Sequence, residues 1–68
     1  MTADITTWQG RLIVERDELS DKLFKLNSFL ARETIPIPVN DFALLTVQAY
    51  LMQAYLDVLD RRLVRAKA

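Results

Sequence analysis

The residues best suited to bind a charged ligand lie near the C-terminus and are basic. Arg61, Arg62, Arg65 and Lys67 place four of the nine cations of the chain within seven residues. One or two cations there would only complement the partial negative charge of a helix C-terminus. Four favour an anion site, because arginine forks bind phosphate in a bidentate manner. Arg61 and Arg65, four residues apart, should share one helical face, with Arg62 about 100° away from it.

An indole and a further arginine lie near the N-terminus. Antiparallel pairing of the two helices predicted below sets Trp8 beside Val64. The same register sets Arg11 beside Arg61. Flat aromatic and guanidinium faces stack on nucleobases, so this end of the molecule is predicted to bind an anionic, base-containing ligand.

Lys22 and Lys25 form a second basic spot, in the middle of the first predicted helix. Asp21 lies beside them, and charge runs on helices are usually solvated ion-pair faces. Taken alone, these two lysines are better explained by such a face than by a ligand.

The residue types argue against catalysis. The chain has no His and no Cys, so the usual general base and the imidazole and thiolate ligands are missing. Asp57 and Asp60 lie three residues apart and resemble an acid–base pair. Two antiparallel helices offer no evident cleft for them, however, and Arg61 follows directly. We therefore expect a protein that is not an enzyme, without a cofactor or a metal.

Two helices must position these residues. Apolar side chains at steps of three, four and seven predict a helix over residues 7–33 and another over 41–66. The residues before the two prolines are pushed out of helical geometry, so 34–40 should be an extended connector. Two helices of similar length joined in this way should lie antiparallel. The expected fold is all-α, one helical-hairpin domain over residues 1–68.

The helix ends and the seam between the helices follow from the same pattern. Thr6 or Thr7 can cap the first helix, and Asn40 or Asp41 the second. Arg16 occupies a slot of the first stripe that calls for an apolar residue. The seam of the second helix consists of Phe42, Leu45, Ala49, Met52, Leu56, Leu59 and Leu63.

A second apolar face on the second helix exceeds what a hairpin can cover. Its members also recur at helical steps and are Leu44, Val47, Leu51, Tyr55 and Val58. A monomer of 68 residues would be only marginally stable, because it buries little surface and has no disulfide. Exposed apolar patches of this kind usually mark a partner surface. We expect a homo-oligomeric helical bundle.

Composition narrows the other partners. Nine basic residues balance nine acidic ones, which does not favour polymeric nucleic acid. No uninterrupted apolar run approaches the roughly 20 residues of a membrane span. The N-terminus is polar and acidic, unlike a signal peptide. We expect an intracellular protein that binds neither polymeric nucleic acid nor a membrane.

Both helices carry residues that resemble a known family. In the first helix they are the stretch Trp8–Leu19, then Lys22-Leu23, Lys25-Leu26 and Phe29-Leu30; in the second they are Gln48, Met52, Tyr55, Val58-Leu59 and Arg62-Leu63. The chain resembles the small phage helical-hairpin proteins that act as anti-CBASS cyclic-oligonucleotide sponges. CBASS is an antiphage defence in which an infected bacterium makes cyclic nucleotides that activate a killing effector.

The resemblance implies a function. Such proteins are homo-oligomers, typically hexamers, that bind cyclic dinucleotides, and some also bind cyclic trinucleotides, without cleaving them. A related family binds cyclic ADP-ribose signals. By resemblance, Trp8, Arg11, Lys22 and Lys25 occupy ligand-binding positions, to which the residue pattern adds Arg61, Arg62 and Arg65. The implied location is the cytoplasm of the infected bacterial host. The alternative is a non-catalytic coiled-coil scaffold or regulatory module that binds a partner protein through its second apolar face.

Overall fold

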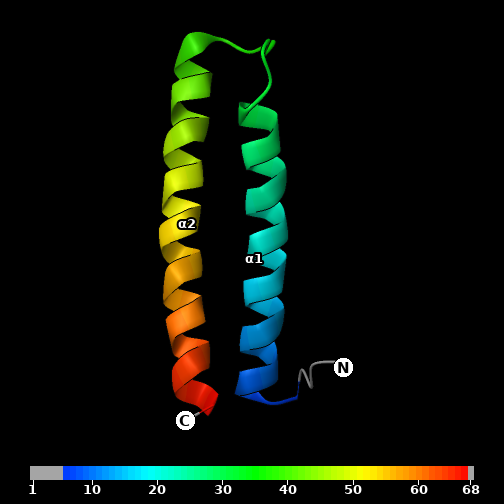
Figure 1. Ribbon diagram of the computed structural model, residues 1–68, viewed down its shortest axis with the longest axis vertical. Helices are drawn as coiled ribbons and strands as arrows, with labels where there is room; N and C mark the ends of the chain where they lie inside the picture. Colours follow the sequence, from blue (N-terminus) through cyan, green and yellow to red (C-terminus); the bar gives the residue numbers. More distant parts are fainter. Residues whose placement is uncertain (1–5, 68) are drawn as a thin grey trace.

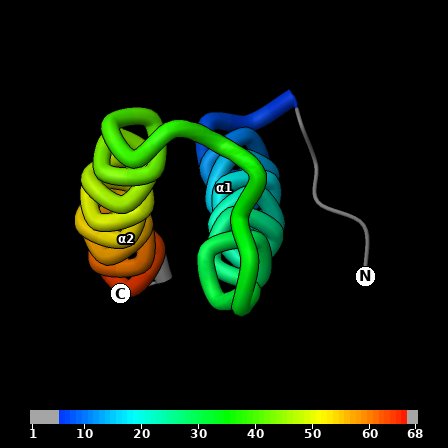
Figure 2. Tube along the Cα trace, turned by 90° about the horizontal axis from the view of Figure 1, so that it is seen from above, coloured from blue at the N-terminus to red at the C-terminus, as the bar shows by residue number. Residues whose placement is uncertain are grey.

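Two long helices account for nearly all of the structure. The computed structural model describes residues 6–67, apart from the side chain of Lys67. Helix α1 (Trp8–Leu30) and helix α2 (Val39–Lys67) run antiparallel and are joined by an extended connector (Figure 1). Seen from above, the two helices lie side by side with the connector passing over their tops (Figure 2). No strand occurs in this part of the chain, so the predicted all-α hairpin is confirmed.

Helix α1 ends three residues before the predicted boundary. The Ala31 N–H still bonds to Asn27 O at 3.0 Å, but the Arg32 N–H bonds to Phe29 O at 3.2 Å. The second bond spans three residues, and such tighter bonds commonly close the last turn of a helix. The backbone therefore leaves helical geometry before the first proline exerts its effect.

Helix α2 begins two residues earlier than predicted, at Val39. The first helical bond runs from the Phe42 N–H to Pro38 O, at 3.0 Å. The prediction that Asn40 or Asp41 caps this helix is wrong, because both lie inside its first turn. Proline has no N–H to leave unsatisfied, so it is well suited to precede a helix. The carboxylate of Asp41 favours the positive end of the helix dipole instead.

The hydrophobic core lies along the seam between the helices. The buried apolar side chains are Leu12, Leu23, Ala49, Leu56 and Leu59. Leu19, Leu26, Leu30 and Met52 pack against them as half-buried neighbours. All seven predicted seam residues of α2 are buried or half-buried, so the seam prediction is confirmed.

The second apolar face of α2 is exposed in the hairpin. Its members, which we call the α2 stripe, are Leu44, Val47, Leu51, Tyr55 and Val58, with exposed fractions of 45–68%. A helix that is apolar on two sides is normally buried on two sides or spans a membrane. By length and mean hydropathy, which reaches 1.3 over 18 residues, Val39–Ala66 is also able to cross a membrane, and 17% of that window is buried in the hairpin. One such helix is weak evidence for a membrane, because the core helix of a soluble assembly passes the same test.

Candidate ligand-binding site at the open end of the hairpin

A cavity lies at the open end of the hairpin, where α1 begins and α2 ends. It has a volume of about 370 Å³ and is lined by Trp8, Arg62, Arg65 and Ala66. We call it the open-end cavity. The indole comes from the first turn of α1 and the guanidinium groups from the last two turns of α2, so residues more than 50 positions apart in sequence meet here. Trp8 is 52% exposed, which leaves much of its side chain open to a ligand.

The first turn of α1 fixes the position of Trp8. Thr7 is the N-cap, and its Oγ1 accepts a hydrogen bond from the Gly10 N–H at 3.0 Å. The predicted cap is therefore confirmed without the help of a capping box. Gly10 is itself buried, so the absence of a side chain there allows close packing at the start of the helix. The cap and this close approach hold the indole at the cavity.

The electrostatics of the open-end cavity favour an anion. Neither Arg62 nor Arg65 takes part in an ion pair among the residues that the structure describes. The first turn of α1 carries no acidic side chain, so this turn adds no negative charge beside the two arginines. Two arginines thus line one hollow that also offers an aromatic surface.

Two of the three predicted arginines line the cavity. Arg62 and Arg65 line the cavity together, whereas Arg61 is exposed and does not line it. Residues three apart on a helix are neighbours just as residues four apart are, so Arg65 can be a neighbour of both Arg61 and Arg62.

The remaining predicted site residues lie outside this cavity. Arg11 is exposed, and its Nη1 atom donates a hydrogen bond to Thr6 O at 3.4 Å. Lys22 and Lys25 are exposed on α1, roughly 21 and 25 Å along the helix axis from Trp8. Lys25 forms an ion pair with Asp21 at 2.9 Å. Within one chain these lysines therefore cannot reach a ligand held by Trp8.

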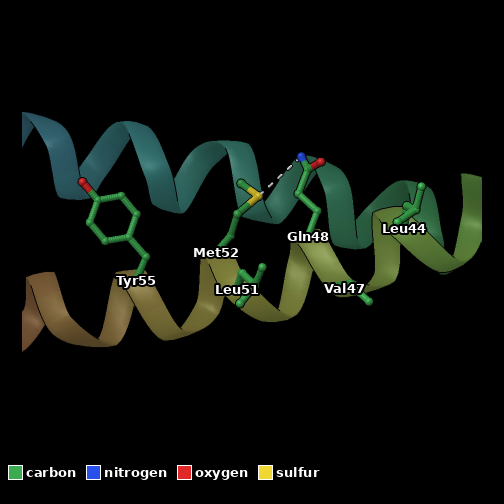
Figure 3. Close-up of a pocket in the computed structure, with 6 residues that line it drawn as sticks. All are labelled: Leu44, Val47, Gln48, Leu51, Met52 and Tyr55. Carbon is green, nitrogen blue, oxygen red and sulfur yellow. Dashed lines mark hydrogen bonds between the residues drawn. The ribbon is translucent and has the colours of Figure 1, made fainter.

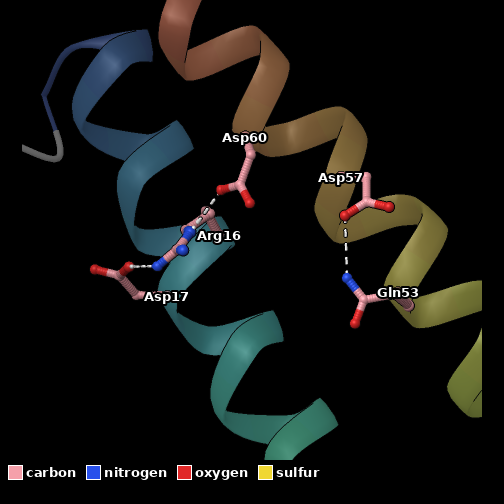
Figure 4. A network of polar contacts seen from close by, with 5 residues as sticks. All are labelled: Arg16, Asp17, Gln53, Asp57 and Asp60. Atoms are coloured by element: carbon pink, nitrogen blue, oxygen red, sulfur yellow. Dashed lines mark hydrogen bonds and ion pairs between the residues drawn. The ribbon is translucent and has the colours of Figure 1, made fainter.

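A polar bridge crosses the seam outside the open-end cavity. The Arg16 Nε atom donates to Asp60 Oδ1 at 2.7 Å, and its Nη1 atom lies 3.2 Å from Asp17 Oδ1 (Figure 4). Both contacts raise the pKa of Arg16, the hydrogen bond to Asp60 most. The sequence identified Arg16 as an interruption of the apolar stripe, and the structure gives the reason, because an acid from the other helix meets it.

The two carboxylates once considered as an acid–base pair serve separate structural contacts. Asp60 accepts from Arg16 across the seam, while Asp57 Oδ1 accepts from Gln53 Nε2 of its own helix at 3.0 Å (Figure 4). Within the described residues, no three His, Cys, Asp or Glu side chains gather closely enough to hold a metal ion. The acids thus have evident structural roles.

A shallow apolar groove of about 470 Å³ follows α2 over the N-terminal part of the α2 stripe. It is lined by Leu44, Val47, Gln48, Leu51, Met52 and Tyr55 (Figure 3). The Tyr55 hydroxyl donates a hydrogen bond to the Glu15 carboxylate of α1. That bond is the main cause of a raised pKa of the phenol, burial adds to it, and the charge of Arg62 opposes it.

Comparison with known proteins places the chain in a family. The molecule is a helical hairpin with a hollow at its open end, lined by a tryptophan and two arginines, and with an exposed apolar stripe on α2. The family model described as Sequestin matches residues 6–65. The chain therefore belongs to the Sequestin family. No curated protein and no solved structure matches it.

Proposed function

We propose that this protein sequesters cyclic oligonucleotides, namely cyclic dinucleotides or trinucleotides, without cleaving them, and thereby blocks CBASS immunity. The observation that carries the proposal is the open-end cavity, where Trp8 meets Arg62 and Arg65. A cyclic dinucleotide offers two phosphates and two bases, for which guanidinium forks and an indole are the matching groups. The name of the Sequestin family is compatible with a sequestering role.

Binding alone suffices for such a role. Charge-assisted hydrogen bonds contribute about 1.5–3 kcal/mol each, and base stacking on an aromatic ring contributes about 1–3 kcal/mol. A few of these contacts reach tight binding. A sponge needs affinity and abundance but no general base, which agrees with a chain that has no His and no Cys.

The working form in this proposal is a homo-oligomer, hexameric by resemblance, in the cytoplasm of the infected bacterial host. Symmetry supports it, because a two-fold interface presents every residue twice and a cyclic dinucleotide has approximate two-fold symmetry. A site formed by several copies can also contain residues that lie far apart within one chain. Arg11, Lys22, Lys25 and Arg61 enter the proposal in that way.

The test is calorimetric titration with a panel of cyclic di- and trinucleotides, followed by denaturation and chromatography of the released ligand. Tight binding and recovery of the intact ligand are expected. Arg32, at the opposite end of the hairpin, supplies the matched control, since its guanidinium group lies 5.6 Å from the centre of the Phe29 ring. Arg32→Gln should bind as the unchanged protein does. Recovery of a cleaved ligand would instead indicate an enzyme.

A scaffold that binds a partner helix is the second candidate, because the α2 stripe offers a groove for an amphipathic helix. The same panel separates the two functions. A protein that binds no cyclic nucleotide at any concentration reached, yet remains folded by circular dichroism, would leave the scaffold as the better proposal.

A further inference from the structure

The α2 stripe is symmetric about its middle residue. From Leu51, the next members lie four residues away in both directions, at Val47 and Tyr55. The outer members, Leu44 and Val58, lie seven residues away in both directions. With 3.6 residues per turn, all five side chains project within about 40° of one direction. The stripe therefore has the same spacing when it is followed from either end of the helix.

This symmetry selects the partner that covers the stripe. Packing against a foreign helix does not require it. A second copy packed antiparallel across a two-fold axis makes full use of the symmetric spacing, because each residue then meets the residue at an equal distance on the other side of the axis. With the axis at Leu51, Val47 meets Tyr55 of the second copy, and Leu44 meets Val58. Every apolar member then faces an apolar member.

The available surface is sufficient for such a contact. The five side chains are about half exposed, so they offer on the order of 500 Å² per copy and about 1,000 Å² for a pair, which reaches the lower limit for a specific interface. A lipid bilayer would also accept an apolar helix, but burial in lipid does not depend on a symmetric spacing of the apolar residues. The spacing thus favours a second copy over a membrane.

We propose that a second copy of this chain packs antiparallel on the α2 stripe with Leu51 at the two-fold axis, so that the connector of each copy lies beside the open-end cavity of the other. Arg62 follows Leu51 by eleven residues and Asn40 precedes it by eleven, and both project within about 20° of the Leu51 direction. Asn40 of the second copy therefore lies opposite Arg62.

The cavity is thereby shared between copies. Within one chain, Asn40, in the first turn of α2 beside the connector, lies roughly 33 Å from Arg62 along α2, so a copy cannot bring its own connector to its own cavity. The pairing creates two equivalent cavities, one at each end of the dimer, each bordered by the connector of the other copy. The ligand class of this cavity rests on the proposed function, whereas the pairing itself does not.

Cysteine cross-linking tests the register, because the chain has no cysteine of its own. At the usual interaxial distance of about 8–10 Å, facing Cα atoms come within disulfide range. Leu51→Cys should therefore form a disulfide dimer under mild oxidation. Val47→Cys, on the same stripe, is the matched control and should not cross-link alone, since its two copies are about 12 Å apart along the axis. Mixed with Tyr55→Cys, it should yield the mixed dimer.

Two results would overturn the proposed register. Equal cross-linking of Val47→Cys and Leu51→Cys alone would indicate parallel pairing. Failure of Leu51→Cys to cross-link, with the chain floating on phosphatidylcholine–phosphatidylglycerol vesicles, would assign the stripe to a bilayer, and failure without flotation would mean that the two-fold contact does not form.

The shared cavity is tested through Trp8, the single tryptophan of the chain. A bimane dye on Asn40→Cys is quenched by an indole only at short range, and its own Trp8 lies at the other end of the hairpin. We expect the bimane fluorescence to be quenched. The fluorescence should recover when Trp8→Phe or Leu51→Asp is added to the labelled chain. Leu51→Asp separates the copies but leaves the buried seam intact. Suppose that the Leu51→Cys variant cross-links as expected. If the bimane on the separate Asn40→Cys variant is then not quenched, the shared cavity is refuted. Neither measurement uses a nucleotide, so both are independent of the proposed function.

Discussion

Arg16 of α1 and Asp60 of α2 form a hydrogen-bonded ion pair across the seam, with 2.7 Å between Nε and Oδ1.

Asp60→Ala should lower the melting temperature, because it leaves a guanidinium group in the seam without its cross-helix acid. Asp57→Ala is the matched control and should lower the melting temperature less, since Asp57 accepts a hydrogen bond from Gln53 of its own helix rather than from α1. Thermal unfolding followed by circular dichroism measures both. Equal losses would show that the cross-helix pair has no specific contribution.

The fully buried Leu59 should be the most sensitive position of the core. Its exposed fraction is 0%, so Leu59→Ala should destabilise the fold by about 2–5 kcal/mol through the lost contacts and the cavity left behind. Val64→Ala, at an exposed position of the same helix, should change the unfolding free energy far less. Urea denaturation of both variants provides the comparison, and similar midpoints would contradict the assigned core.

Trp8→Ala should weaken the binding of a cyclic dinucleotide by about 1–3 kcal/mol if the indole stacks on a base. The melting temperature should change little, because about half of this side chain is exposed. Phe24→Ala removes another exposed aromatic residue of α1 and should leave the affinity unaltered. A large drop in melting temperature with full affinity in the folded protein would instead make Trp8 a packing residue.

Arg62→Gln and Arg65→Gln should each reduce affinity for an anionic ligand and also reduce its salt dependence, since one phosphate contact is lost. Arg61→Gln should have a smaller effect, because Arg61 does not line the open-end cavity. Calorimetry at two salt concentrations measures the difference. If all three variants bind with unchanged affinity, these arginines belong to a solvated face.

Tyr55 should make stability depend on alkaline pH. Its hydroxyl donates to Glu15, which raises the pKa of the phenol in the folded state above the value of about 10 in an unfolded chain. The resulting stabilisation is complete below pH 10 and is lost as the pH rises through the folded-state pKa.

The measurement is an ultraviolet titration in a Tyr50→Phe background, so that one phenol is observed. Glu15→Ala should move the titration of Tyr55 to lower pH, whereas Glu18→Ala on the same helix should not. An unshifted titration in the Glu15 variant would show that the hydrogen bond is absent in solution.

The sequence predicted the hairpin and its seam because an apolar period maintained over several turns leaves one arrangement that buries it. The helix ends were less predictable. Pro38, rather than Asn40 or Asp41, precedes α2, since its carbonyl accepts the first helical bond while its side chain offers no cap that a pattern would reveal. The length of α1 was overestimated because the closing bond of Arg32 depends on backbone geometry alone.

The candidate site was predicted in outline. Trp8 and two arginines meet at the open end, as the antiparallel register required, because the register follows from the seam. Which arginines face the indole depends on the rotation of the last turns of α2 about their axis, and the spacing of Arg61, Arg62 and Arg65 permits two pairings. The role of Arg16 could not be predicted from the sequence, because its partner, Asp60, lies 44 residues away along the chain.

The open-end cavity is built from the first turn of one helix and the last turns of another, the parts of a helix that open most readily. A ligand bound there contacts both of these helix ends and restrains their local opening. Part of the binding free energy is therefore used to order backbone. Ligand binding should slow amide hydrogen exchange at the start of α1 and at the end of α2 by similar factors, and not near the connector. The ligand-bound protein should also be cleaved more slowly by proteases that attack its termini than the ligand-free protein.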